Sequence, residues 1–427
     1  MRERRIINRK KTDIHRGGVG YRVTKLFADI STRMSYTRSE YTGLENIPED
    51  GIVIFAPNHC NTLIDALHIL RMRWNQTVFG ARADLFNKPA LAKLLTFLKI
   101  LPMVRVRDGL SNVTKNYDTM GKIYTVLGDG VPFCMFAEGT HRPKHSLLPL
   151  KKGLFRIALE VNSLYDKPVY VVPVGLEYGD YFRYASSILV NVGEPINVTE
   201  YVRDHSESKE AEIYRGLLEM LHEKISGLIT YIPDDDDYEK VWDYVKIATA
   251  GKRPFSLKKR LDNNRAVVES ILADKEGKSE LLSSAVEFDK KRKKAGISSL
   301  SLGFKYPAFR TSLKTLVTVL LLPVTALVMV MAIPSLAINT FLCKKVIKDR
   351  AFRNSVRAAV NMLVGLVLAL AMLITSVCMG HSYWLVICGF IAPFMSLWTI
   401  EWYRVLFSDY MLMCRADIRK AFSALRK

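Results

Sequence analysis

Three stretches near the C-terminal end of this sequence carry no charged side chain, and they constrain its fold most strongly. They cover residues 315–343, 358–379 and 383–400. About 20 consecutive apolar residues form a helix long enough to cross the hydrocarbon core of a bilayer, which is about 30 Å thick. The sequence therefore predicts an all-α membrane region over residues 311–427.

The residues that flank these stretches are basic, and this bias predicts how they cross the membrane. The positive-inside rule places such flanks in the cytosol, so 358–400 is expected to form a transmembrane hairpin with its tip at 380–382. The stretch 315–343 contains Pro323 and Pro334. Two arms of about 14 residues would rise only about 21 Å each, which favours a re-entrant or interfacial wedge. A single long tilted helix is the alternative.

The charge balance predicts an anionic partner. The formal net charge is +20 and the isoelectric point is about 9.6. An anionic membrane is favoured over nucleic acid, because apolar stretches are present and no zinc-finger spacing or RNA-binding aromatic motif accompanies the basic residues. The 6 cysteines are scattered without a CxxC pair, so we expect neither a disulfide framework nor a metal site, and a soluble part that faces the reducing cytosol.

Two further segments have unusual charge. Residues 1–45 are basic and include an amphipathic stretch at 21–34, which either lies on an anionic bilayer or packs on the following domain. Residues 233–310 read as a charged helical linker. The basic run at 290–294 in this linker is predicted to contact anionic headgroups, and the alternative is a solvated helix end.

Residues 46–232 alternate short apolar runs with helical periodicity. The sequence predicts strands at 52–56, 77–79, 103–106, 132–136, 169–174 and 188–192. It predicts helices at 63–71, 89–99, 112–127, 152–162 and 209–230. This alternation is typical of an α/β domain with a mixed, mostly parallel sheet flanked by helices.

The first candidate site follows the first strand of this domain. His59 comes just after the strand, and Asp65 follows six positions later. Six residues of one continuous helix would turn by about 600° and separate the two side chains. If Asn61 or Thr62 is the N-cap, His59 lies in the preceding turn and reaches back to Asp65. The pair is then either a general base with its carboxylate or a turn histidine beside a helix start.

Two more groups of polar residues follow later strands. Arg105 lies along or just past a strand, where a guanidinium group can bind phosphate. Glu138, Gly139 and Thr140 end another strand, where glycine permits a sharp turn whose N–H groups face an anion, with Arg142 close behind to neutralise it. Lys151 and Lys152 add positive charge before the next helix.

In this order the motifs resemble the PlsC-like glycerolipid acyltransferases over roughly residues 40–230. The family's Asn-His and following Asp match Asn58-His59 and Asp65. Its second block is similar to 81–86 through 102–105, and its Phe-Pro-Glu-Gly-Thr-Arg block is similar to 136–141, followed by 150–153. An apolar strand with a proline, 171–174, matches its fourth block.

The resemblance implies a role for each candidate residue. His59, oriented by Asp65, would remove a proton from an acceptor hydroxyl as it attacks an acyl thioester. The phosphate of the acceptor would be bound by Arg105, Glu138, Gly139, Thr140 and Arg142. Arg82, Lys151 and Lys152 are further candidates for substrate binding. The donor would be acyl-CoA or acyl carrier protein, and no cofactor is implied.

Two departures from the family pattern leave the acceptor open. Five residues instead of four separate His59 from Asp65, and His141 stands where the family has arginine. A lipid acceptor, 1-acylglycerol 3-phosphate, is favoured because the chain has apolar hairpins. The alternatives are glycerol 3-phosphate or dihydroxyacetone phosphate, another lipid such as an aminolipid, and a non-catalytic lipid-binding role.

Overall fold

The computed structural model describes residues 14–15, 17–73, 75–103, 113–252, 254–379 and 383–426. Arg105, part of the predicted strand at 103–106 and the predicted hairpin tip at 380–382 lie outside these residues. The chain divides into two compact units. The first comprises Met1–Ile30, Tyr41–Glu177 and Leu189–Ile229, and the second comprises Ser31–Glu40, Tyr178–Ile188 and Thr230–Lys427.

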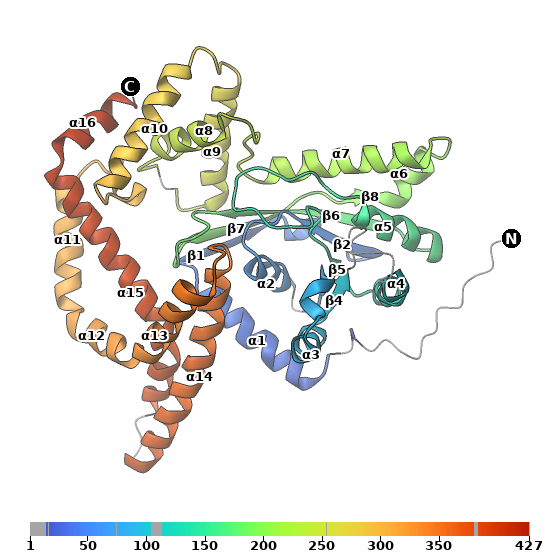
Figure 1. The fold of residues 1–427 in the computed structure, drawn as a ribbon, viewed down its shortest axis with the longest axis horizontal. Helices are drawn as coiled ribbons and strands as arrows, with labels where there is room; N and C mark the ends of the chain where they lie inside the picture. Colours follow the sequence, from blue (N-terminus) through green and yellow to red (C-terminus); the bar gives the residue numbers. More distant parts are fainter. Residues whose placement is uncertain are drawn as a thin grey trace. The chain divides into compact units, whose positions relative to one another are not determined.

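The α/β part of the chain contains strands and helices in alternation (Figure 1). In chain order they are α1 (Val19–Met34), β1 (Arg38–Thr42), β2 (Ile52–Pro57), α2 (Leu63–Arg71), β3 (Val78–Arg82), α3 (Pro89–Phe97), β4 (Ile100–Met103), α4 (Val113–Gly128), β5 (Phe133–Cys134), α5 (Gly153–Leu164), β6 (Val169–Tyr178), β7 (Ser187–Val192), β8 (Ile196–Asn197), α6 (Val198–Asp204) and α7 (Glu210–Leu228). Short 3-10 turns occur at Leu44–Asn46 and Ala83–Phe86.

These strands form one mixed sheet with the order β1-β7-β6-β2-β5-β3-β4, and β8 pairs with β6. The central strand β2 runs parallel to both β5 and β6, and β3 runs parallel to β4 and β5. All six residues of β2 are buried, as expected for a parallel strand covered on both faces. The carboxyl ends of the parallel strands therefore meet at one edge of the sheet, where His59 follows β2.

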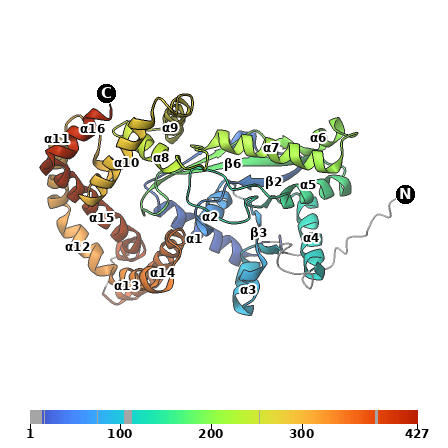
Figure 2. The same ribbon diagram turned by 45° about the horizontal axis from the view of Figure 1, so that its top comes forward.

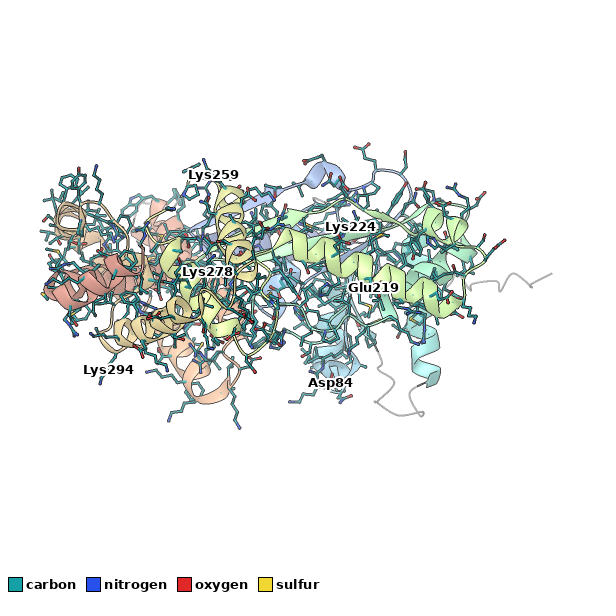
Figure 3. The ribbon with its side chains drawn as sticks, turned by 90° about the horizontal axis from the view of Figure 1, so that it is seen from above. Asp84, Glu219, Lys224, Lys259, Lys278 and Lys294 are labelled. Atoms are coloured by element: carbon teal, nitrogen blue, oxygen red, sulfur yellow. The ribbon has the colours of Figure 1, made fainter. Side chains whose placement is uncertain are left out.

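Helices cover both faces of this sheet, with α7 along one face and α2 along the other (Figures 1 and 2). The buried residues of α7 are Leu217, Leu221 and Ile225. They recur every four residues, so one face of the helix packs inward. Glu219 lies on an exposed part of α7 (Figure 3).

Several predicted strands differ from the observed ones. The strand β1 was not predicted, because its sequence Arg-Ser-Glu-Tyr-Thr is polar and none of its five residues is fully buried. The strand β4 begins at Ile100, before the predicted residue 103, since Leu101 pairs with Gly80 of β3. Edge strands have one free side, so burial marks them weakly in a sequence.

The second unit begins its main helical part with α8 (Tyr238–Ala248), α9 (Leu257–Leu272) and α10 (Ser279–Lys294). One apolar core joins these three helices through residues such as Val245, Val268 and Leu282. The predicted lipid-facing run 290–294 closes α10. Its Arg292 is buried, and its Nε donates to Asp289 Oδ1 at 3.1 Å. This arginine is therefore not available to a headgroup, whereas the other four cations of the run are exposed.

Three short apolar helices follow where the sequence predicts a segment broken by prolines. They are α11 (Pro307–Leu320), α12 (Leu322–Met331) and α13 (Ile333–Phe341). The chain bends by 63° between α11 and α12. Each break lies two residues before a proline, Pro323 or Pro334, because proline fits the first turn of a helix but cannot continue one. The helices are thus interrupted near both prolines, and the re-entrant or interfacial wedge expected for 315–343 stays a prediction.

Two long helices, α14 (Arg353–Met379) and α15 (Trp384–Cys414), complete this region before α16 (Ala416–Ala424). By length and composition α14 and α15 could each cross a membrane. Their polarity is inverted relative to a water-soluble helix. In α14 the polar Asn354, Asn361 and Ser376 are buried, whereas Leu363 and Val367 are 65% and 68% exposed. Such an arrangement fits a lipid environment, in which exposed apolar side chains meet acyl chains.

Hydrogen bonds explain why the short segments Ser31–Glu40 and Tyr178–Ile188 belong to the second unit, called the helical unit below. Ser31 Oγ donates to Ala358 O at 2.9 Å, and Asn354 Nδ2 donates to Tyr181 O at 3.0 Å. The indole Nε1 of Trp398 donates to Met34 O at 2.8 Å. These bonds join α14 and α15 to segments that lie far away in the sequence.

The close approach of α14 to α15 yields a prediction. A Cβ at Gly365 would lie 2.6 Å from Phe390 O, and a Cβ at Gly389 would lie 2.9 Å from Leu368 O. We expect Gly365→Val to separate the helices and destabilise the full-length protein in detergent by about 1–3 kcal/mol, the usual cost of overpacking. Thermal unfolding measures this. Val367→Ile adds bulk on an exposed face of α14 and should have no effect; an equal loss in both variants would contradict the close packing.

Candidate active site

His59 follows β2 at the carboxyl edge of the sheet, and Asn58 holds the end of that strand in place. The side chain of Asn58 pairs with the backbone of Leu176 in β6: Oδ1 accepts from Leu176 N at 2.7 Å, and Nδ2 donates to Leu176 O at 3.2 Å. The same Nδ2 donates to Cys60 Sγ at 3.1 Å. The amide thus extends the β2–β6 pairing by one residue, and the chain then turns away at a defined position.

Asp65 organises the turn that follows. Its Oδ2 accepts from His59 Nδ1 at 2.8 Å, from Cys60 N at 2.8 Å and from Asn61 N at 2.7 Å. The residue is fully buried. The helix α2 covers Leu63–Arg71, as predicted, and Thr62, one of the two residues considered, is its N-cap. The backbone of Thr62 has φ 52° and ψ −128°, a strained conformation for a β-branched residue, and such strain is common at functional sites.

A second loop holds the backbone of His59 from the opposite direction. Glu138 Oε1 accepts from His59 N at 2.7 Å, and Arg142 N donates to His59 O at 2.9 Å. The other oxygen of Glu138 accepts from Leu148 N at 2.8 Å. Burial raises the pKa of the Glu138 carboxyl, although these backbone donors and the charge of Arg142 act in the opposite direction. Glu138 therefore connects the turn after β2 with the loop after β5.

The imidazole ring of His59 lies between two other rings. Phe136 stacks on it with ring centroids 4.0 Å apart and planes 24° apart. His141 meets it edge-on, with centroids 5.6 Å apart. The His59 side chain is 17% exposed, and among the described residues its Nε2 has no hydrogen-bond partner. The ring is therefore fixed in orientation, and one nitrogen remains accessible.

Sequence reasoning did not identify Phe136 as part of this site. The available signal was its position at the end of a predicted strand, directly before the Ala137-Glu138 pair. His141 was noted only as a departure from the family pattern. Its edge contact with His59 follows from the left-handed turn at Gly139, whose φ is 70°.

The predicted phosphate-binding residues have different surroundings. Arg142 donates through its guanidinium group to Ser146 Oγ at 2.8 Å, and both oxygens of Glu138 accept backbone N–H groups, as described above. Thr140, Lys151 and Lys152 are exposed. Their predicted role in acceptor binding stays a prediction, as does that of Arg105, which lies outside the described residues.

Arg82 forms a local ion pair. Its Nε donates to Asp84 Oδ1 at 3.0 Å, and both side chains are 52% exposed. An exposed pair of this kind contributes little to stability. The side chain could exchange Asp84 for a substrate phosphate at small cost, so substrate binding by Arg82 also stays a prediction.

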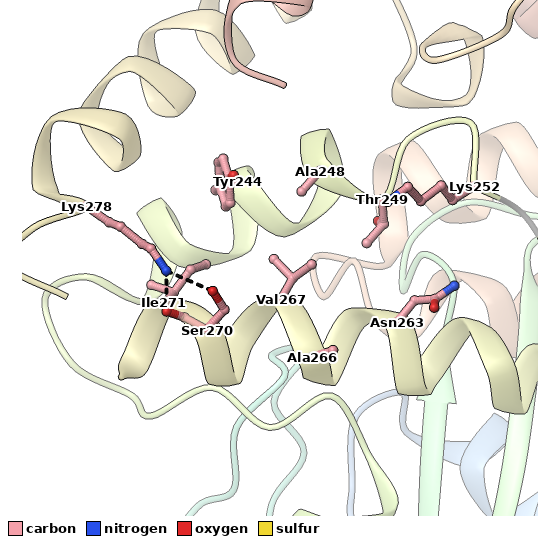
Figure 4. Close-up of a pocket in the computed structure, with 10 residues that line it drawn as sticks. All are labelled: Tyr244, Ala248, Thr249, Lys252, Asn263, Ala266, Val267, Ser270, Ile271 and Lys278. Carbon is pink, nitrogen blue, oxygen red and sulfur yellow. Dashed lines mark hydrogen bonds between the residues drawn. The ribbon is translucent and has the colours of Figure 1, made fainter. Parts of the chain in front are cut away.

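The second unit contains a cleft of about 350 Å³ between α8 and α9 (Figure 4). Its lining includes Lys252 and Lys278, and Lys278 Nζ donates to Ser270 Oγ at 2.8 Å. No histidine or carboxylate is among its lining residues in the described part of the chain. The general-base chemistry expected of His59 therefore has no counterpart there.

A family model and two relatives match the α/β part of the chain. The family model described as Acyltransferase matches residues 38–177. An uncharacterized acyltransferase of Schizosaccharomyces pombe is 27% identical over 141 residues, which cover 33% of this chain and 21% of that protein. A chloroplastic 1-acyl-sn-glycerol-3-phosphate acyltransferase of Brassica napus is 28% identical over 155 residues, which cover 36% of this chain and 41% of that protein. The chain thus spans less than half the length of these relatives.

A solved structure is also similar to this chain. The 1-acyl-sn-glycerophosphate acyltransferase PlsC of Thermotoga maritima matches with 19% identity and a TM-score of 0.34, covering 49% of this chain and 79% of that one. The family model coincides with the segment that carries both loops around His59. Residues 38–177 thus match the Acyltransferase family model, and in this part the chain is similar to a 1-acyl-sn-glycerol-3-phosphate acyltransferase.

Proposed function

We propose that this protein is a membrane-bound O-acyltransferase that transfers a fatty acyl group from acyl-CoA or acyl carrier protein to 1-acylglycerol 3-phosphate. The observation that carries the proposal is the hydrogen bond between the partly exposed His59 and the buried Asp65. Asp65 accepts the Nδ1 proton of His59 at 2.8 Å, so the ring is oriented with Nε2 as the basic nitrogen. A base held in this way can act without reorganising when the substrate arrives.

The proposed reaction needs one proton carrier and no covalent enzyme intermediate. Nε2 of His59 accepts the proton of the acceptor hydroxyl while the hydroxyl oxygen attacks the carbonyl carbon of the thioester. The carbon–sulfur bond then breaks, and the imidazolium returns the proton to the leaving thiolate. The negative charge of Asp65 stabilises the imidazolium in between. Phe136 and the two backbone bonds to His59 keep the ring from turning.

The acceptor is proposed to be a lipid because the helical unit is built for a bilayer. Its helix α12 has no buried residue, and α14 and α15 are long enough to cross the membrane. A lysophospholipid acceptor is already dissolved in that bilayer. The basic flanks of these helices support an orientation with the catalytic domain on the cytosolic side. The phosphate of the acceptor would be bound by the residues predicted from the sequence, which are Arg105, Glu138, Gly139, Thr140 and Arg142.

One sequence feature supports a second candidate, which is the first acylation of glycerol 3-phosphate or dihydroxyacetone phosphate. Five residues separate His59 from Asp65, and Cys60 and Asn61 within that interval donate their backbone N–H groups to Asp65. The longer turn resembles a branch of the superfamily that acts on soluble acceptors. The two candidates differ in whether the acceptor already carries an acyl chain, so one assay separates them.

We therefore predict the following for the full-length protein in vesicles supplied with a radiolabelled palmitoyl thioester. The wild type should acylate 1-acylglycerol 3-phosphate faster than glycerol 3-phosphate, and His59→Ala should lower that rate by a factor on the order of 10² to 10⁴. His205→Ala, at an exposed histidine on the same unit, should remain active. Equal rates for His59→Ala and wild type would refute the general base. A preference for glycerol 3-phosphate would favour the second candidate.

Substitutions of Asp65 should separate its charge from its hydrogen bonds. In Asp65→Asn the amide oxygen can accept two of the three donors, so we expect a smaller loss of thermal stability than in Asp65→Ala and a rate lowered by a factor on the order of 10², since the imidazolium loses its counter-charge. Asp65→Ala leaves buried N–H groups unpaired and should also lose about 1–3 kcal/mol of unfolding free energy. Full activity of Asp65→Asn would show that the charge plays no part in catalysis.

A further inference from the structure

One side of α13 is polar and packs inside the helical unit. Ser335 and Asn339 are buried, and Asn339 Nδ2 donates to Asn361 Oδ1 of α14 at 2.9 Å. The helix continues into a π-helical turn, Leu342–Val346, in which Ile347 N donates to Leu342 O at 2.8 Å. After this turn the chain is extended. These bonds fix which side of α13 faces outward.

The outward side of α13 forms an open groove of about 500 Å³. Its lining consists of Ile333, Leu336, Ala337, Thr340, Phe341, Lys344 and Lys345. The apolar residues are well exposed, with Ile333 at 59% and Phe341 at 61%. The groove is thus apolar along two helical turns and positively charged at one end only.

The length of this groove matches one leaflet of a bilayer. From residue 333 to residue 344 an α-helix rises about 16 Å, whereas half of the hydrocarbon core measures about 15 Å. An acyl chain that lies along the apolar part would therefore place its headgroup beside the two lysines. A groove that binds a protein would not need a length equal to half the thickness of the hydrocarbon core.

The charged end of the groove carries a net positive charge. Lys344 and Lys345 are exposed, and within the described ranges neither forms an ion pair with a carboxylate. Lys348 and Arg350 follow, with Asp349 as the one acid between them. The carbonyl groups at a helix C-terminus amount to about half a negative charge. The four cations therefore outweigh the combined negative charge of Asp349 and these carbonyl groups. Phosphate is the negatively charged group that a bilayer presents at this depth.

We propose that this groove binds one anionic glycerophospholipid of the surrounding bilayer. Its acyl chain would lie against Ile333, Ala337 and Phe341, and its phosphate would contact the ammonium groups of Lys344 and Lys345. This site is independent of the reaction proposed for His59. The bound lipid would stabilise the segment that connects α13 to α14.

The test is native mass spectrometry of the full-length protein in a neutral detergent, titrated with phosphatidylglycerol, phosphatidylcholine or glycerol 3-phosphate. Phosphatidylglycerol should bind about 25-fold more tightly than phosphatidylcholine, and glycerol 3-phosphate, which has the phosphate without the acyl chains, should not bind. Lys344→Gln/Lys345→Gln should remove the preference for phosphatidylglycerol, because each basic residue near an anionic headgroup contributes about a fivefold gain in affinity. The absence of a preference in the wild type would overturn the proposal.

Two matched controls give the test its specificity. Lys167→Gln/Lys259→Gln removes the same charge from exposed positions outside any predicted lipid-binding segment and should leave the preference intact; an equal loss would mean a general charge effect and overturn the site. Ala337→Trp fills the groove and should weaken both lipids, whereas Val324→Trp, at a 59% exposed position of α12, should not. If Ala337→Trp instead dissociates a dimer and leaves lipid binding unchanged, the groove is an interface between two copies.

Discussion

The structure around His59, at the carboxyl end of the sheet, depends on the hydrogen bonds of the buried Asp65 carboxylate. One oxygen accepts three donors, which come from the His59 ring and from the backbone of the two residues after it. Burying a carboxylate is costly unless it is fully hydrogen-bonded. Here the donors and the positive end of α2 offset that cost. The same bonds that orient the imidazole also shape the turn from β2 into α2, so the fold of this turn fixes the orientation of the His59 ring.

The loop after β5 also holds His59 in place. Glu138 and Arg142 bind the backbone N–H and C=O of His59, respectively. Family resemblance predicts that these two residues bind the acceptor phosphate, whereas their contacts in the fold include the backbone of His59. A change in this loop therefore acts on the position of His59 as well as on the substrate. The Glu-Gly-Thr motif thus has a structural reason to accompany the Asn-His motif in one domain.

In the apolar helices of the second unit, polar side chains lie inside and apolar side chains lie on the surface. Asn339 and Asn361 pair in its interior, while Leu363 and Val367 are exposed. In water this arrangement would expose apolar surface, whereas in a bilayer the polar groups find partners only inside the protein. Close packing of Gly365 and Gly389 against neighbouring backbone supports it, because helices in lipid associate through small residues.

The sequence by itself determined the α/β alternation, the start of α2, the two long apolar helices and the breaks near Pro323 and Pro334. Each depends on residues close together in the chain, whose periodicity, capping or missing N–H acts locally. Only the tertiary structure decided the polar edge strand β1, the stacking of Phe136 on His59 and the assignment of Ser31–Glu40 to the helical unit. These features depend on contacts between segments that are far apart in the sequence. Local sequence patterns do not predict such contacts.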